Sequence, residues 1–355
     1  MMVSQAEFIG NVHNSVGCTG CHAGDKDSDS KIAAHEGLIT HPSNSAAQTC
    51  GQCHGLQVGG DASSVHSRLS GYLSMIGVRS GGAFDPDSPE YAAKFQTQCA
   101  KCHTSCGQCH VSRPASVEGG FLNGHMMVRT PSIIDNCTAC HGSRVGEEYL
   151  GERAGFRADV HWNPNAMSCV ACHSGEEMHA AGTSYEKRYD VAQMPRCEDC
   201  HADDAEANDW HTQHWTDVQC QVCHAQEYKN CYSCHAGTGL SEPSTLGFKV
   251  GRNPLPAHRG YAYVVLRHAP IDPNTFSDWG LALPNFDALP TWKYASPHNI
   301  RRNTPQTDTT GTGSCMAVCH NSETIFLRAA DLRDYEVNAN AGVVVPNGPP
   351  PWDDK

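Results

Sequence analysis

The feature that most constrains this chain is a short cysteine–histidine motif that recurs along most of its length. Nine copies have the form C-x-x-C-H: Cys18/Cys21/His22, Cys50/Cys53/His54, Cys99/Cys102/His103, Cys106/Cys109/His110, Cys137/Cys140/His141, Cys169/Cys172/His173, Cys197/Cys200/His201, Cys220/Cys223/His224 and Cys231/Cys234/His235. A tenth copy, Cys315-Met-Ala-Val-Cys319-His320, has one more residue between its cysteines. These copies use all 20 cysteines, so none is left over for a disulfide.

C-x-x-C-H is the attachment signature of c-type haem. The two sulfurs bond the vinyl groups of one porphyrin, and the histidine that follows binds the iron as its proximal ligand. Zinc ribbons and thiol redox centres also use paired cysteines, but neither needs a histidine after every second cysteine. The sequence therefore predicts ten haems c, with the motif histidines as proximal ligands.

Two motifs share the stretch CAKCHTSCGQCH, residues 99–110, so their haems must nearly touch. Even a fully extended chain separates His103 from His110 by only about 25 Å, and a helical chain by about 10 Å. The stretch 220–235 imposes a similar constraint. Adjacent haems permit rapid electron hopping, which a single-haem enzyme does not need.

The 22 histidines leave twelve outside the motifs, slightly more than ten irons need as distal ligands. We expect most of them to complete bis-histidine iron. The candidates are His13, His35, His66, His125, His161, His179, His211, His214, His258, His268 and His298. His41, which precedes a proline, is the least favoured.

The sequence Trp210-His-Thr-Gln-His-Trp215 is informative among these candidates. An i, i+3 spacing puts both imidazoles on one side of a helical turn, where each can serve a different haem. A zinc site from this pair lacks an evident third ligand. Methionine could replace a distal histidine, but for Met126, Met127 and Met178 we prefer packing roles.

The composition predicts a fold class that is mostly irregular coil with short α-helices and little β structure. The chain of 355 residues is only 39% hydrophobic and is rich in Gly (33) and Pro (20), so it is expected to wrap closely packed haems rather than build its own core. Helices are expected in the motif turns and over residues 89–99 and 203–214.

Motif placement suggests three regions. Residues 1–235 carry nine haems, and 236–314 form a motif-free segment rich in Pro, Trp and Tyr. We read this segment as a strap that supplies distal histidines, with a sub-domain as the alternative. Residues 315–355 hold the tenth motif and a tail, which is either ordinary or an inter-subunit arm whose AGVVV adds a strand to a neighbour.

Charge and compartment restrict the partners. A net charge of −13 argues against nucleic acid and anionic membrane surfaces. The start, MMVSQAEFIGNV, has no signal-peptide pattern, so we expect a mature chain. Haem is attached to such motifs outside the cytoplasm, and the longest apolar runs, 261–266 and 341–345, are too short to span a bilayer. The expected location is extracellular or periplasmic.

With ten motifs placed, and with stretches such as CGQCHVSRP, CTACHGSRVG and CHSGEEMH, the chain resembles decahaem members of the multihaem c-type cytochromes used for extracellular electron transfer. The resemblance covers most of the chain, and the tenth motif departs from the usual form. Some relatives polymerise into filaments, and in several a distal histidine comes from the next subunit. Others are monomeric shuttles or parts of outer-membrane conduits.

The leading functional hypothesis is therefore an electron carrier without enzymatic activity, polymerised into a filament or nanowire. Its partners would be other cytochromes or extracellular acceptors such as metal oxides. One alternative is a monomeric periplasmic shuttle or conduit component. Another is a reductase of a small oxyanion or a nitrogen or sulfur compound, which needs one iron with an open site. No lysine replaces a motif histidine, but the tenth site could hold an open haem.

Overall fold

The computed structural model describes residues 9–68, 70–99, 104–122, 124–180, 187–232, 242–308, 310, 315–320 and 324–346. The chain divides into two compact units, each assembled from separate stretches of sequence. Unit 1 comprises Met1–Gly71, Cys99–Gly142 and Ser168–Met194, and unit 2 comprises Tyr72–Gln98, Ser143–Met167 and Pro195–Lys355. Six of the ten motifs belong to unit 1 and four to unit 2. The described part of the motif-free segment 236–314 is one portion of unit 2.

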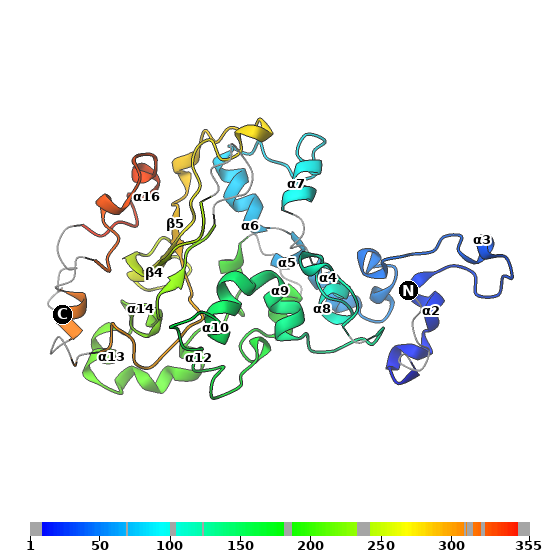
Figure 1. Ribbon diagram of the computed structural model, residues 1–355, viewed down its shortest axis with the longest axis horizontal. Coiled ribbons are helices and arrows are strands. Elements are labelled where there is room, and N and C mark those ends of the chain that lie inside the picture. Colours follow the sequence, from blue (N-terminus) through cyan, green and yellow to red (C-terminus); the bar gives the residue numbers. More distant parts are fainter. Residues whose placement is uncertain are drawn as a thin grey trace. The chain divides into compact units, whose positions relative to one another are not determined.

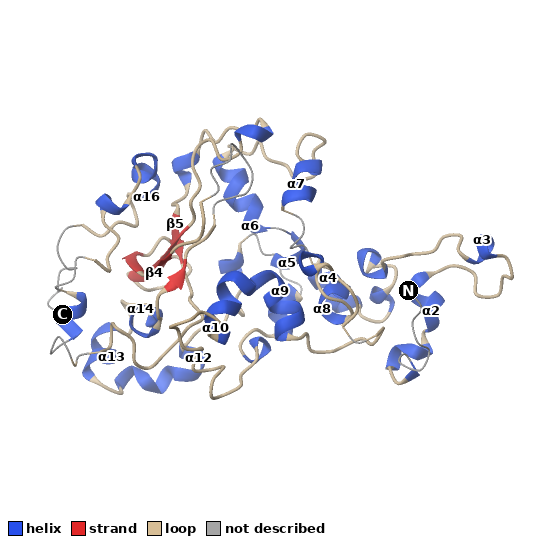
Figure 2. Ribbon diagram, viewed as in Figure 1, coloured by secondary structure: helices blue, strands red, loops and turns tan. Residues whose placement is uncertain are grey.

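Short helices dominate the secondary structure. Helical residues make up 41% of the chain and strands 7%, and the longest described helices, α4 and α7, have seven residues each. The prediction of short helices with little sheet is confirmed (Figure 2). The structure is nevertheless mixed, with more helix than the predicted predominance of irregular coil implies.

Unit 1 consists of helical turns joined by loops (Figure 1). Its elements are η1 (Val12–Ser15), α2 (Gly17–His22), α3 (Lys31–Ala34), η2 (Pro42–Ser45), η3 (Cys50–Gln52), α4 (Gly55–Asp61), α5 (Val65–Arg68), α8 (Cys106–His110), η6 (Ala115–Val117), η7 (Ile133–Cys137), α9 (Thr138–His141), η9 (Cys169–Ala171), α11 (Gly175–Met178) and η11 (Arg188–Asp190). Two further helices, α6 (Ser70–Tyr72) and η8 (Gly142–Gly146), span the unit boundaries in the sequence.

Unit 2 adds strands to its helices. The helices are η4 (Leu73–Gly77), α7 (Ala92–Gln98), α10 (Glu147–Leu150), α12 (Glu198–His201), η12 (Ala202–Glu206), α13 (Asp209–His214), α14 (Cys220–His224), η13 (Ser277–Trp279), η14 (Phe286–Ala288), α15 (Cys315–Cys319), η15 (Ala329–Asp331), η16 (Asp334–Glu336) and α16 (Val337–Asn340). The strands are β1 (Tyr228–Lys229), β2 (Leu246–Gly247), β3 (Lys249–Arg252), β4 (Tyr263–His268) and β5 (Trp292–Tyr294).

The motifs form helical turns for a geometric reason. In a helix, residues i, i+3 and i+4 lie on one side, so a turn presents both cysteines and the histidine together. Helices α2, α8 and α14 each end at their motif histidine. The helices expected over 89–99 and 203–214 are also present, as α7 and as η12 with α13.

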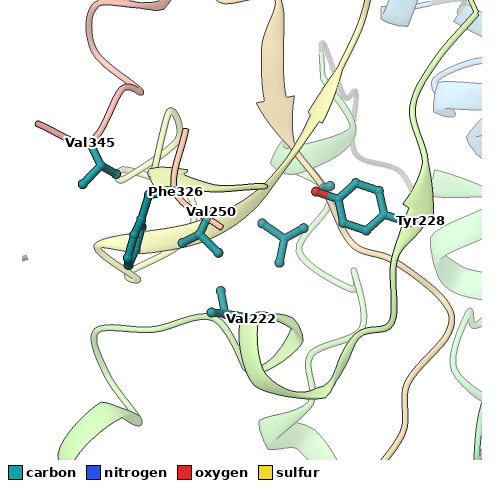
Figure 3. Packing of buried hydrophobic residues seen from close by; sticks show 7 residues of the cluster. Val222, Tyr228, Val250, Phe326 and Val345 are labelled. Atoms are coloured by element: carbon teal, nitrogen blue, oxygen red, sulfur yellow. The ribbon is translucent and has the colours of Figure 1, made fainter. Parts of the chain in front are cut away.

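An antiparallel sheet in the order β3-β4-β5 forms the centre of unit 2. Its middle strand carries Val264, Val265 and Leu266, all fully buried, as expected for a strand covered on both faces. Gly251 on β3 is required, because a Cβ there would lie 2.3 Å from Leu266 Cδ1 and 2.6 Å from the Val343 carbonyl oxygen. Figure 3 shows Val250 of β3 in the same apolar cluster as Val222 of α14.

The AGVVV stretch packs within its own chain. Arg252 N donates to the Val343 carbonyl at 2.9 Å, and Val345 N donates to the Leu327 carbonyl at 2.9 Å. Val343 and Val345 are buried, and Val345 lies beside Phe326 (Figure 3). These valines are therefore not free to add a strand to a neighbour, and the rest of the suggested arm, 347–355, lies outside the described residues.

The two units differ sharply in apolar core. Among the described residues of unit 1, only Ala180 and Val191 are buried hydrophobic side chains, whereas unit 2 buries the sheet and many aromatic rings. Unit 1 instead leaves large apolar side chains exposed beside its motifs, as at Val12 (84% exposed) and Leu56 (89%). The described polypeptide of unit 1 therefore has almost no apolar core of its own.

Candidate haem sites

Seven motif histidines each face a histidine from outside the motifs. The ring centroids of the seven pairs are 5.9–6.4 Å apart. With the candidate haems numbered by motif order, the pairs are His22–His125 (haem 1), His54–His13 (haem 2), His110–His179 (haem 4), His141–His66 (haem 5), His201–His161 (haem 7), His224–His211 (haem 8) and His320–His214 (haem 10). Each pair lies within one unit.

This spacing fits two imidazoles on opposite sides of one iron. A metal–imidazole nitrogen bond is about 2.0 Å, and the ring centre lies about 1.1 Å beyond the nitrogen, so two axial rings have centres about 6.2 Å apart. Among the described residues, no group of three or more His, Cys, Asp or Glu side chains could hold a metal ion by itself. A planar four-nitrogen macrocycle would supply the remaining ligands between each pair.

The two histidines of helix α13 point to different partners. His211 lies 6.1 Å from His224, and His214 lies 6.4 Å from His320. Asn208 caps the start of this helix, and its side chain accepts the backbone N–H of His211 at 3.0 Å. This cap fixes the turn that presents both imidazoles.

The remaining candidates are placed differently. His268 Nε2 hydrogen-bonds Glu336 Oε1 at 2.6 Å, and its ring stacks on Trp292 at 4.7 Å. Its Nε2 is therefore held by a carboxylate, and a role for His268 as a distal ligand stays a prediction. His298 donates its backbone N–H to Glu148 Oε2 at 3.0 Å, and the carbonyl of His258 accepts from the Arg259 side chain at 3.0 Å.

Two candidates near the N-terminus are exposed to solvent. His35 Nδ1 hydrogen-bonds the Lys31 carbonyl at 2.6 Å, and His41 lies at the start of η2. No ring partner is described for either one.

Parts of three motifs lie outside the described residues. These are Cys102 and His103 of the third, Cys234 and His235 of the ninth, and the side chain of Cys315 in the tenth. His173 of the sixth is described, and its Nδ1 hydrogen-bonds both oxygens of Glu177 at 3.0 Å.

The second cysteines of motifs 2, 6, 7 and 8 are covered by the polypeptide to different degrees. Cys53, Cys172 and Cys200 are exposed, and each donates its backbone N–H to the carbonyl of the first cysteine of its motif at 3.2 Å. Cys223 is half-buried, and its carbonyl accepts from the Thr304 hydroxyl. The chain was expected to wrap cofactors, but the polypeptide alone leaves Cys53, Cys172 and Cys200 exposed. A bound porphyrin would cover them. The attachment of haem to all four stays a prediction.

Neighbouring groups hold many of the paired rings by Nδ1, so Nε2 is the nitrogen that would be used to bind a metal. Backbone carbonyls accept from His22, His110, His179, His211, His214 and His224 at 2.6–3.2 Å. Side-chain oxygens accept from His13, His161 and His201 at 2.7–2.9 Å. Such contacts orient metal-ligating histidines and fix their tautomer.

The environment also favours the ligating form of several rings. Burial lowers the pKa of His66, His224 and His320, which keeps the imidazole neutral, the form that binds a metal. At two other histidines the shift has the opposite direction. The Asp159 carboxylate raises the pKa of His161, and Glu177 raises the pKa of His173, through hydrogen bonds to Nδ1.

The attachment sulfurs show which motifs are neighbours. In unit 1, Cys21 lies in electrostatic range of Cys50, Cys50 of Cys106, and Cys109 of Cys140. The thiols of Cys137 and Cys169 lie close enough to shift each other's pKa, as do those of Cys197 and Cys220 in unit 2. The side chain of Gln221, in the eighth motif, donates to Cys197 Sγ at 4.0 Å. These thiols stand where thioethers would be, so the sites follow the order 1-2-4-5-6 in unit 1 and 7-8 in unit 2.

The groups that hold the rings were not predicted from the sequence. They include Asn11, Asp159, Glu177 and Asp204. A signal was present, since these residues stand two residues before a distal histidine or three to four after a motif histidine. That spacing lets one turn bring a carboxylate or amide oxygen to Nδ1.

Comparisons with family models, curated proteins and solved structures find no match for this chain. Among the described residues, no helix is long and apolar enough to cross a membrane.

Proposed function

We propose that this chain is an exported decahaem c-type cytochrome that carries electrons along bis-histidine haems and polymerises into a filament. The observation that carries the proposal is the set of seven opposed histidine pairs at the spacing of two axial imidazoles. Six of the seven pairs join histidines that are 40 or more residues apart in the sequence, which chance clustering does not explain.

The uneven apolar core supports the same proposal. Unit 1 exposes Val12 beside His13 and Leu56 just after His54, both at candidate haem 2. A porphyrin between the two histidines would bury these side chains. The haems would then supply the core that the described polypeptide of unit 1 lacks.

The order of the sulfurs supports electron transfer over catalysis at one centre. Neighbouring attachment sulfurs would bring their porphyrins into near contact, and electrons hop quickly between such neighbours. At the seven paired sites, two imidazoles of the chain would hold the iron and leave no coordination position for a substrate.

The filament part of the proposal rests on helix α3. His35 Nδ1 hydrogen-bonds the carbonyl four residues earlier, the same contact that orients the distal ligands His179 and His214. Its ring is exposed, as is Ile32 on the same helix face (86%). A ring prepared in this way but facing solvent fits a ligand supplied to a haem of the next copy, as the resemblance to filament-forming cytochromes implies.

The test uses protein purified after native export. Alkaline pyridine spectra and intact mass should give ten covalent haems per chain, and carbon monoxide should bind few of the reduced irons. Electron microscopy should show filaments with a regular repeat. Bound zinc without haem would refute the cytochrome proposal. Discrete particles would favour the shuttle, and particles with one substrate-binding iron would favour the reductase.

A further inference from the structure

We propose that Asp159 and Asp204 are positioning residues that lower the reduction potential of haem 7, so that an electron on haem 7 passes downhill to haem 8. This inference rests on the proposed binding of haem and concerns how the chain sets a direction for electron flow. It is carried by the different groups that hold the four axial histidines of these two neighbouring sites.

Asp159 holds the distal ligand of haem 7. Its Oδ1 accepts from His161 Nδ1 at 2.7 Å and from the His161 backbone N–H at 2.8 Å. Its Oδ2 accepts from the Ile300 N–H at 2.7 Å. Asp159 is only 2% exposed, and its one described ion-pair partner is His161 itself. A fixed, buried negative charge is thus directed at one axial ligand.

Asp204 contacts one ligand of each haem, but with different groups. Its side-chain Oδ2 accepts from Nδ1 of His201, the proximal ligand of haem 7, at 2.9 Å. Its backbone carbonyl accepts from Nδ1 of His211, the distal ligand of haem 8, at 2.6 Å. The other ligand of haem 8, His224, lies 3.2 Å from the Arg301 carbonyl. Haem 7 therefore has two carboxylates on its ligands, and haem 8 has two neutral carbonyls.

This difference sets the relative potentials. An imidazole that donates Nδ1–H to a carboxylate gains negative character and becomes a stronger donor to its metal. A stronger donor stabilises the ferric state, which lowers the potential. The haem held by His110 and His179 has carbonyls on both ligands and should resemble haem 8. Because the side-chain amide of Gln221 in the eighth motif lies 4.0 Å from Cys197 Sγ of the seventh, haems 7 and 8 are neighbours and the step between them is a single hop.

The experiment compares Asp159→Asn and Asp204→Asn with Asp203→Asn in the full haem-loaded protein. Asp203 is an exposed neighbour for which no contact to an axial ligand is described, so its variant removes the same charge without the hydrogen bond. Redox titration followed by haem absorbance gives the one-electron components. His161→Met identifies the component of haem 7, because a methionine ligand raises its potential.

We expect D159N and D204N each to change the equilibrium constant for reduction of haem 7 about tenfold in favour of the reduced state. This raises the potential of the haem 7 component by about 59 mV for one electron. The near-infrared magnetic circular dichroism of the ferric protein should shift with it, since that band reports the donor strength of the axial imidazoles. D203N should change the equilibrium constant for reduction of haem 7 less than threefold. The haem 8 component should stay in place in D204N, because the backbone carbonyl remains.

If the variants carry ten haems and their haem 7 component moves no more than in D203N, this inference is overturned while the proposed function stands. A shift in potential without the spectroscopic change would also overturn it, because general charge would then be the cause. D204N alters an exposed side chain and guards against misfolding at the buried Asp159. A wild-type chain without haem would instead refute the proposed function.

Discussion

At the scale of single residues, most of the paired histidines are held in place by a hydrogen bond at Nδ1. Where Nδ1 donates to a described oxygen, as in both histidines of the pair His110–His179, Nε2 is the nitrogen that would bind an iron. In the proposed cytochrome, the cysteines would hold the porphyrin by separate bonds. Loss of one distal imidazole should therefore open one iron without releasing its haem.

Helix α13 allows this to be tested at two haems. We expect His211→Ala to open haem 8 and His214→Ala to open haem 10, because each ring faces a different motif histidine. Each variant should keep ten haems and gain one carbon monoxide site per chain in the reduced state. The double variant should gain two, measured by difference absorbance in the Soret region.

His268→Gln is the matched control. His268 Nε2 is bonded to the buried Glu336, and glutamine keeps a donor for that carboxylate. No new carbon monoxide site should form. A new site in this variant would show that His268 is an axial ligand in the loaded protein, contrary to its placement here.

At the scale of elements, the sequence predicts the motif turns but not the pairings between them. The positions of both cysteines and the histidine follow from one helical turn, so α2, α8 and α14 could be predicted locally. The partner of His22 is His125, far along the chain, and single-sequence periodicity carries no information on such contacts. The histidine count alone indicated distal ligands without saying which haem each one serves.

The sheet of unit 2 was missed for the same reason. Strand β4 was noted as an apolar run, but its pairing with β3 and β5 depends on residues from other parts of the chain. Val343 and Val345 complete that packing from near the C-terminus. A stretch of valines can serve a neighbour or its own chain, and only the tertiary structure distinguishes the two.

The close approach at β3 gives a stability prediction. Gly251→Ala should lower the free energy of unfolding by about 1–3 kcal/mol, the usual cost of forcing extra atoms into a packed core. The added Cβ would overlap the Leu266 side chain and the Val343 carbonyl. Gly260→Ala, where the Cβ would meet nothing within 4 Å, should have little effect. Guanidinium unfolding followed by far-ultraviolet circular dichroism measures both, and equal midpoints would contradict the packing.

At the scale of the whole molecule, the two units should depend on haem to different degrees. Burying Ala180 and Val191 contributes only about 3 kcal/mol, while ordering each residue costs about 1–2 kcal/mol. Unit 1 therefore has little described apolar packing to hold it without cofactor, whereas unit 2 keeps its sheet and its aromatic cluster around Trp279.

We therefore expect the chain made without haem attachment to lose unit 1 first. Limited proteolysis with mass spectrometry should find early cuts in 1–71 and 99–142, while the sheet region 246–294 is cut later. The haem-loaded protein, as the control, should resist in both. Equal cleavage rates in the two units of the haem-free chain would show that unit 1 has a polypeptide core of its own.

The proposed assembly into filaments depends on the exposed residue His35. If His35 completes an iron in the next copy, His35→Ala should leave every subunit with ten haems, add one carbon monoxide site per chain, and shorten or abolish filaments in electron micrographs. His41→Ala is the control, because His41 is a nearby exposed histidine without a described hydrogen bond that orients its ring. That variant should polymerise normally and bind no additional carbon monoxide. Filaments that survive His35→Ala with no new open iron would assign subunit contact to another surface, and the ring of His35 would then have no part in carrying electrons between copies.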